Sequence, residues 1–283
     1  MVAPSDSYSA CSVDDNVINL GSGTGGPQLE SCVVLDNGFM ASNVAKIKLL
    51  APYVAQNCRP GQFVHLKLPD LEAHILRRPF SVYAADANSG EVQLLYQAVG
   101  QGTEHLTTLS KGTVLNVIGP IGRGWQPPEN AQKVLLVGGG LGSAPLYLLA
   151  ASFSAEIELH MVMGAQNAEM LVCQNPFLTY IPDERLHITT DDGSVGRRGF
   201  TTAVAKDLLE AGGFDYVATC GPEPMQRIVA QLAAEAAVRC EVSLERRMAC
   251  GVGACLGCMV HTTAGPQRAC VDGPVFNAAE VIW

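Results

Sequence analysis

Four cysteines close to the C-terminal end constrain the fold of this chain more than any other feature of its sequence. They are Cys250, Cys255, Cys258 and Cys270, in the spacing C-x4-C-x2-C-x11-C. Gly251, Gly253 and Gly257 stand between the first three. Glycine allows a backbone to take positive φ angles and to approach a bound group closely. The spacing therefore predicts a glycine-rich loop that wraps a group held by thiolates.

The same spacing indicates which group is held. A packed C-x4-C-x2-C triplet with a later fourth cysteine is typical of plant-type [2Fe–2S] clusters. Amide N–H groups between the ligands can point at sulfur and help to set the potential of the cluster. The alternative is a structural zinc site with four thiolates, which usually shows two C-x2-C pairs. We predict a [2Fe–2S] cluster and a chain that transfers electrons; a zinc-bound adaptor without catalytic activity is the alternative from another class.

Composition excludes several function classes. The 283 residues suffice for two domains and a small module, and 48% hydrophobic with 16% charged residues is typical of a globular protein. A net charge of −9 without a block of Lys or Arg argues against a nucleic-acid-binding surface. We find no apolar run long enough to span a membrane and no signal-peptide pattern at the N-terminus. The ten cysteines are therefore expected to be reduced, and the expected location is cytoplasmic.

The chain is expected to divide into four parts. Residues 1–29 are polar and rich in glycine, which is typical of a flexible tail. Residues 30–130 contain short alternating strands, which predict a small antiparallel barrel. Strands and helices alternate in residues 131–239, which predicts an α/β domain with a parallel sheet. Residues 240–283 form the cysteine module. The expected strands are 44–50, 62–68, 80–84, 91–98, 134–137, 156–163, 185–190 and 214–220, and the expected helices are 144–153, 201–211 and 222–238.

Two segments of the barrel region have features of a phosphate site. Pro79 keeps Arg78 in an extended conformation, and a guanidinium matches a phosphate bidentately, with the Ser81 hydroxyl nearby. Further on, the glycine-rich turn 100–103 leads into an expected helix at 104–109 with Thr103 as its N-cap. Free N–H groups at such a helix start suit a pyrophosphate. The alternative for Arg78 is a solvated turn.

The α/β region has three candidate nucleotide-binding segments at the ends of expected strands, where ligands collect in open α/β sheets. The glycine loop departs from G-x-G-x-x-G because Ser143 takes its third glycine position, and no acidic residue ends the second strand. That loop alone therefore leaves nucleotide binding open. The alternative for the segment that begins at Cys220 is a rigid turn into a helix. The candidate residues are Gly138, Gly139, Gly140, Gly142, Asp191, Cys220, Gly221, Pro222 and Met225.

The sequence contains no recognisable catalytic triad or histidine cluster. His65 lies in an expected alternating strand and is interpreted as a packed or surface residue. The chemistry is therefore expected to reside in cofactors, and no catalytic residue is predicted.

In their order along the chain, these motifs resemble those of the ferredoxin-reductase superfamily. The resemblance is closest to the electron-transfer subunits of class 1B, NAD-dependent, dihydroorotate dehydrogenase. It covers about residues 30–283, and its most specific part is the run 244–258 around the first three cysteines.

The resemblance implies a barrel that binds FAD, an α/β domain that binds NAD and a C-terminal [2Fe–2S] module. It implies a partner subunit with FMN that oxidises dihydroorotate in pyrimidine biosynthesis, in a heterotetramer with two copies of each chain. Electrons are then expected to run from that FMN through the cluster and FAD to NAD+. The residues that it implies for FAD are Arg78, Pro79, Phe80, Ser81, Leu95, Tyr96, Gln97, Gly102 and Thr103.

Two other members of the superfamily remain as alternatives. They are the small subunit of an electron-bifurcating NADH-dependent ferredoxin:NADP oxidoreductase and the reductase subunit of a sulfhydrogenase. The first cluster ligand of the bifurcating relative is typically Asp, whereas this chain has Cys250. Cys250 therefore favours the dihydroorotate interpretation.

Overall fold

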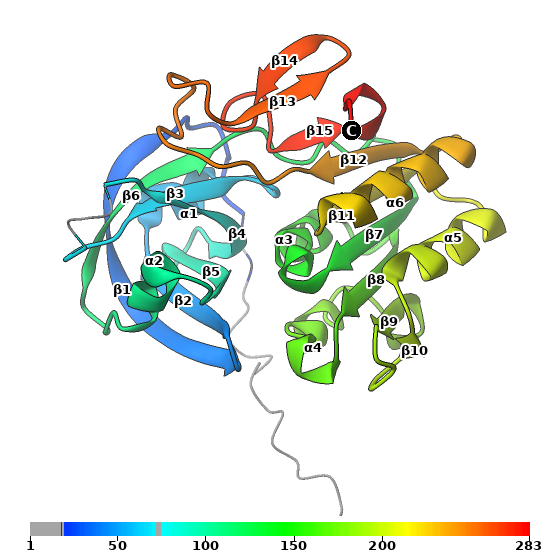
Figure 1. Ribbon diagram of the computed structural model, residues 1–283, viewed down its shortest axis with the longest axis horizontal. Helices are drawn as coiled ribbons and strands as arrows, with labels where there is room; N and C mark the ends of the chain where they lie inside the picture. The colour runs from blue at the N-terminus through cyan, green and yellow to red at the C-terminus, as the bar shows by residue number, and fades with distance from the viewer. Residues whose placement is uncertain (1–17, 19, 72–74) are drawn as a thin grey trace, which may run out of the picture.

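A closed antiparallel barrel forms the N-terminal part of the computed structural model, which describes residues 18, 20–71 and 75–283 (Figure 1). Its strands, in spatial order, are β1 (Gln28–Ala41), β2 (Val44–Leu50), β5 (Glu91–Gln97), β4 (Arg78–Asp86), β3 (Phe63–Lys67) and β6 (Val114–Ile121). Alternate side chains fill the interior, and Ile47, Leu66 and Leu94 are fully buried there. The predicted barrel is confirmed.

Two short helices, α1 (Pro52–Asn57) and α2 (Gln101–Thr107), pack on the barrel. The prediction that Thr103 is the N-cap of the second helix is wrong. Gly100 is the N-cap, and Thr103 is the third residue of the helix. The Thr103 hydroxyl reaches back to accept hydrogen bonds from the amides of Val99 (3.0 Å) and Gly100 (3.3 Å). Because these bonds hold the preceding turn, the helix begins earlier than the position of the threonine suggests.

The described part of the N-terminal segment lies against α1. The Gly25 amide donates to the Asn57 side chain (2.9 Å), and the Tyr53 hydroxyl donates to the Gly26 carbonyl (2.8 Å). Residues 20–27 are therefore held by hydrogen bonds. The remainder of the expected flexible tail, residues 1–17 and 19, lies outside the described residues.

The second domain is built on a seven-stranded sheet. Its strands, in spatial order, are β10 (Arg197–Arg198), β9 (Leu186–Thr190), β8 (Glu158–Ala165), β7 (Lys133–Gly139), β11 (Tyr216–Cys220), β12 (Arg239–Ser243) and β15 (Val275–Asn277). All neighbouring strands are parallel except β12 and β15. The predicted parallel α/β sheet is confirmed.

Helices cover both faces of this sheet (Figure 1). Helices α5 (Thr201–Ala211) and α6 (Glu223–Glu235) pack on one face with Leu135 and Val217, whereas α3 (Ala144–Ser152) packs on the other with Leu136. The remaining short helices are α4 (Gln174–Phe177) and the 3-10 turns Gly140–Ser143, Ala168–Met170, Asp183–Arg185 and Ala278–Glu280. None of the helices in the described part of the chain has both the length and the apolarity that crossing a bilayer requires.

The cysteine module joins the sheet of the second domain. Its hairpin, β13 (Met259–Thr262) and β14 (Gly265–Arg268), is followed by β15, which pairs with β12. The predicted division between residues 239 and 240 therefore falls at the start of a strand of this sheet. Figure 1 shows the module, in orange and red, next to both the barrel and the α/β domain.

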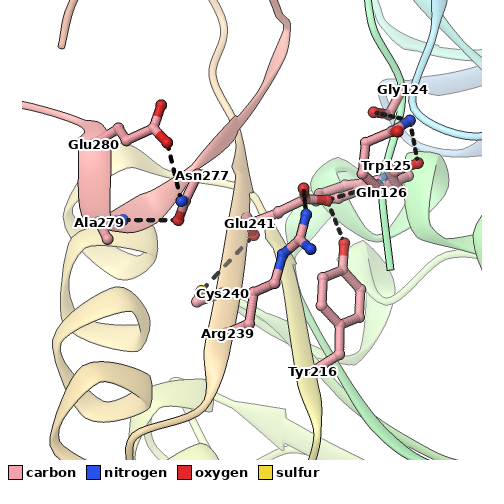
Figure 2. Close-up of polar contacts among 10 residues, drawn as sticks. All are labelled: Gly124, Trp125, Gln126, Tyr216, Arg239, Cys240, Glu241, Asn277, Ala279 and Glu280. Atoms are coloured by element: carbon pink, nitrogen blue, oxygen red, sulfur yellow. Dashed lines mark hydrogen bonds and ion pairs between the residues drawn. The ribbon is translucent and has the colours of Figure 1, made fainter. Parts of the chain in front are cut away.

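A buried carboxylate ties the connection between the barrel and the second domain to the sheet (Figure 2). Glu241 on β12 accepts hydrogen bonds from the Tyr216 hydroxyl (2.5 Å), the Gln126 amide (2.7 Å) and Arg239 (2.9 Å). Burial, with the charge of Glu241 next, raises the pKa of Tyr216 well above its usual range, so the phenol stays a donor. A buried charge needs such partners because an unpaired one is strongly destabilising.

The barrel and the second domain also share an aromatic contact. Tyr83 on β4 stacks on Tyr147 of α3, with 4.8 Å between the ring centroids and 24° between the planes. Both rings are fully buried. This contact places the barrel strand β4 directly against a helix that follows the glycine loop.

Candidate electron-transfer site

The loop after Cys250 is already folded around the sulfur of that residue. The amides of Val252 (3.5 Å) and Cys255 (3.4 Å) donate to Cys250 Sγ. Gly251 and Gly253 take φ angles of +69° and +81°, which let the turn close. Burial raises the pKa of the Cys250 thiol, but the amide donors outweigh it and lower the pKa to about 6. The ligand is therefore largely a thiolate near neutral pH, which is the form that binds metal.

The four cysteines form two pairs. Cys258 and Cys270 are buried with their sulfurs 3.4 Å apart, whereas Cys250 and Cys255 are more accessible, and a contact with the Cys255 side chain also lowers the pKa of Cys250. In the described part of the chain, no three Cys, His, Asp or Glu side chains converge on a point that could hold one metal ion. Two irons sharing four thiolates fit two pairs better than a single tetrahedral zinc. The residues present fit a [2Fe–2S] cluster.

The structure brings together the two barrel segments that were expected to bind phosphate. Arg78 begins β4, and a Cβ atom placed on Gly102 of α2 would lie 3.0 Å from its Nε atom. The guanidinium therefore lies over the glycine turn, and its Nη1 atom donates to the Leu76 carbonyl (2.7 Å). Because Gly102 leaves room for this approach, Gly102 and Arg78 form one cradle with positive charge and backbone amides, which fits a nucleotide phosphate.

The other residues implied for FAD differ in what they can offer. Pro79, Ser81 and Gln97 are accessible, whereas Phe80, Leu95 and Tyr96 are buried. Tyr96 donates to the Asn37 side chain inside the barrel (2.8 Å), with its ring 5.9 Å from that of Phe80 in an edge-on contact. Only the backbone of these three buried residues is therefore able to reach a flavin.

A cavity of about 800 Å³ lies where the barrel meets the carboxyl ends of the parallel strands. Most of the predicted NAD residues line it: Gly139, Gly140, Gly142, Asp191, Gly221, Pro222 and Met225, together with Gln97 of the barrel. Gly138 and Cys220 do not. A Cβ on Gly138 would lie 2.4 Å from Ser143 Oγ, and burial raises the pKa of the Cys220 thiol to about 12.

The glycine loop and the loop after β11 touch backbone to backbone. A Cβ on Gly142 would lie 2.5 Å from Gly221 Cα and 2.6 Å from the Cys220 carbonyl oxygen. A Cβ on Gly139 would meet Met225 at 2.7 Å. These contacts explain why glycine stands at both positions although the standard fingerprint is not met.

Several lining residues were missed by the sequence analysis. Gln166, Thr189 and Phe200 line the cavity near Asp191, and Glu245 lines it beyond β12. The Glu245 carboxylate is near enough to Cys220 to add, after burial, to the rise in its pKa. The carboxyl ends of parallel strands meet at one edge of a sheet, so the residues after β8 and β12 could have been predicted to line this cavity.

Two family models match separate parts of the chain. A family model described as an oxidoreductase FAD-binding domain matches residues 31–125. A second, described as the iron–sulfur cluster binding domain of dihydroorotate dehydrogenase B, matches residues 245–282 and thus all four cysteines. Among solved structures, one described as an NADH-dependent reduced ferredoxin-NADP oxidoreductase, studied for flavin-based electron bifurcation, is 31% identical with a TM-score of 0.80 and 89% of each chain covered. A cytochrome P450 reductase from Amycolatopsis, 22% identical with a TM-score of 0.60 over 74% of this chain and 66% of that chain, shares the fold.

Curated relatives match nearly the full length. The electron transfer subunit of dihydroorotate dehydrogenase B (NAD(+)) from Fusobacterium nucleatum is 35% identical over 261 residues, covering 90% of this chain and 98% of that protein. The subunit of the same name from Desulforamulus reducens is 36% identical over 250 residues, covering 87% of this chain and 95% of that protein. This chain therefore belongs to the family of electron transfer subunits of dihydroorotate dehydrogenase B (NAD(+)).

Proposed function

We propose that this chain takes electrons from the FMN of a partner subunit and delivers them, through a [2Fe–2S] cluster and FAD, to NAD+. The observation that carries the proposal is the order of the sites. On one side of the barrel, His65 of β3 contacts the cluster loop at Gly251. On the other side, Gln97 of β5 lines the cavity. The barrel residues expected to hold FAD lie between the two. A bound cluster carries single electrons, and a bound flavin exchanges both single electrons and a hydride, so the pair links a one-electron donor to NAD+.

The binding residues proposed from the sequence are retained, with the roles that their surroundings support. The four cysteines hold the cluster as two pairs. Arg78 and Gly102 hold a phosphate of FAD, while Phe80, Leu95 and Tyr96 contribute backbone only, as their burial requires. The glycine loop and the loop after β11 receive NAD, and Asp191 lines the same cavity. Gly138 and Cys220 lie outside the cavity, and their proposed role is to hold these two loops in position.

The proposed domain division follows the sequence, with one change. We retain the barrel at 30–130, the α/β domain from 131 and the cluster module at the C-terminal end. Because β12 pairs with β11 inside the sheet, the boundary of the module is better placed after Ser243 than after residue 239.

The family name implies a catalytic partner subunit, and we propose that it docks over the accessible cysteine pair. Val252, Leu256 and Val271 expose 53%, 60% and 42% of their surfaces beside these cysteines, which gives the loop an apolar rim. Such a rim around a cofactor suits a partner that brings its own cofactor close. FMN in that partner, a heterotetramer with two copies of each chain and a cytoplasmic location remain predictions.

A second candidate partner is favoured by one observation. The 31% identity to an NADH-dependent reduced ferredoxin-NADP oxidoreductase supports a role in another flavin and iron–sulfur complex. The bifurcating relative is expected to have Asp as its first cluster ligand, whereas this chain has Cys250, whose sulfur accepts hydrogen bonds from two amides. This difference favours the dihydroorotate partner. Coupling assays with both kinds of partner decide between them.

The chain alone is expected to pass electrons from NADH to an artificial acceptor and to be inactive on dihydroorotate. The proposed sites for FAD and NAD lie in this chain, whereas its sequence contains no recognisable acid–base constellation for the oxidation of dihydroorotate. The measurement is dye reduction by NADH, followed by NAD+ reduction with dihydroorotate, with and without the catalytic subunit. NADH formation from dihydroorotate by this chain alone contradicts the proposal. Coupling only to a different oxidoreductase supports the second candidate.

Arg78→Ala is expected to weaken FAD binding about tenfold, because a partly exposed charge-assisted contact contributes about 1.5 kcal/mol. Iron content should be unchanged, since the cysteines lie in another module. The measurement is flavin retained after dialysis at a series of protein concentrations. Arg197→Ala on the edge strand β10 is the matched control and should retain FAD like wild type. Equal retention by Arg78→Ala and the control removes Arg78 from the site.

A further inference from the structure

One buried histidine of the barrel lies in a place that the proposed binding sites do not explain. His65 on β3 has no exposed surface, and neither ring nitrogen makes a well-aligned hydrogen bond with the described residues, although the backbone carbonyls of Arg77 and Cys250 lie near the ring. A buried imidazole without a well-aligned partner is costly, so this position points to a role beyond packing.

The strand register places His65 on the same side of the sheet as the residues proposed for FAD. His65 pairs with Pro79 of β4, and its neighbour Phe63 pairs with Ser81. Directly opposite residues of antiparallel strands share one face, with Cβ atoms about 4.5–5.5 Å apart. The imidazole therefore stands beside Pro79 and Ser81, two residues of the flavin motif that are not buried.

On its other side the imidazole meets the cluster loop. A Cβ atom on Gly251 would lie 2.4 Å from His65 Nδ1 and 3.1 Å from its Cε1 atom. Gly251 follows the ligand Cys250 directly, so the ring abuts the backbone of the first cluster ligand. Among the described glycines between the ligands, Gly257 has only Cys255 nearby and Gly253 meets Val271 and Arg268 of the module itself. The contact at Gly251 is thus the one of these three that joins the loop to the barrel.

The imidazole brings hydrogen-bonding groups to the cluster loop. It carries at least one N–H donor in either of its protonation states. Sulfur ligands of a cluster accept such donors, and hydrogen bonds to the sulfurs are among the factors that set its potential.

We propose that His65 is a positioning residue that fixes the cluster loop against the flavin strand and tunes the potential of the cluster. The inference rests on the proposed function, since it requires a cluster on the four cysteines and FAD on β4. Electron transfer between two cofactors slows steeply as they move apart. A rigid ring between β4 and Gly251 therefore controls both the driving force and the distance of the step that joins the two cofactors.

The test compares His65→Leu, which keeps the volume and removes both nitrogens, with His65→Gln, which keeps a donor and an acceptor. In His65→Leu we expect full iron, sulfide and FAD, with a changed EPR spectrum of the reduced cluster. At a fixed potential, we expect the ratio of oxidised to reduced cluster to change about tenfold, which corresponds to a shift of about 59 mV in the one-electron potential of the cluster. After mixing with NADH, FAD should be reduced at the wild-type rate and the cluster about tenfold more slowly. His65→Gln should recover most of the potential and rate.

The matched control is His261→Leu, the same change at an exposed position of β13 in the cluster module, and it should match wild type in every measurement. A wild-type spectrum, potential and rate in His65→Leu overturn the inference. Gly251→Ala changes the loop side of this contact and leaves His65 intact, and it should also shift the potential of the cluster. If neither variant shifts it, the contact has no part in electron transfer. Wild-type protein that binds no iron or flavin instead defeats the proposed function, which separates the two failures.

Discussion

Cys258→Ser is expected to remove nearly all iron and labile sulfide from the protein. Cys258 lies 3.4 Å from Cys270 inside the core that joins the module to the sheet, so its loss removes one of the two thiolates of the buried pair. Serine oxygen is a harder ligand than thiolate and binds the iron of a cluster more weakly. Iron, zinc and sulfide analysis of protein produced with ample iron and without oxygen measures the loss. NADH-dependent dye reduction should persist, because the FAD and NAD sites lie elsewhere.

The matched control is Cys32→Ser, the same substitution at a fully buried cysteine of the barrel. It should keep wild-type iron and sulfide even if it lowers the stability of the barrel. Stoichiometric zinc with negligible iron in the wild-type protein contradicts the cluster assignment and restores the zinc alternative. Retention of iron by Cys258→Ser removes this cysteine from the ligand set.

The cysteine spacing predicted a cluster but not how the ligands pair. Cys270 reaches Cys258 only because the hairpin β13–β14 returns the chain to the start of the module. Cys255 is exposed, whereas Cys258 is buried. This difference arises because the module packs on the core of the sheet. These are tertiary effects, and a spacing between residues contains no information about them.

Local patterns were sufficient for the architecture. Strand β2 and helix α5 occupy the predicted residues, because the former alternates and the latter has an apolar stripe of helical period. The long strand β1 was not predicted, since its exposed positions include Leu29 and Phe39 and blur the alternation. The Glu241 network was also invisible, because its donors Gln126 and Tyr216 are far from it in sequence.

The contact of His65 with the cluster loop shows the same limit at the site. An alternating strand suggested a packed or surface histidine, and the ring is fully buried. What it packs against is Gly251, more than 180 residues further along the chain. Only the fold brings the flavin strand and the cluster loop together, so the functional meaning of this histidine had no sequence signal.

The glycine loop was a weak motif in the sequence because its third glycine is replaced by Ser143, yet Gly142 is the residue whose loss should damage NAD binding most. Gly142→Ala places a methyl group 2.5 Å from Gly221 Cα, and because both partners are backbone, one of the two loops that line the cavity must move. A displacement of this size at a binding site can lower the catalytic efficiency about 100-fold, so we expect that loss in kcat/KM for NADH with a dye acceptor.

Gly140→Ala is the matched control, since nothing lies within 4 Å of its Cβ position and its φ of +56° costs about 1–2 kcal/mol of backbone strain alone. Both variants should retain FAD and iron. Wild-type NADH kinetics in Gly142→Ala, or a larger loss in Gly140→Ala, show that close contact between the two loops does not shape the NAD site.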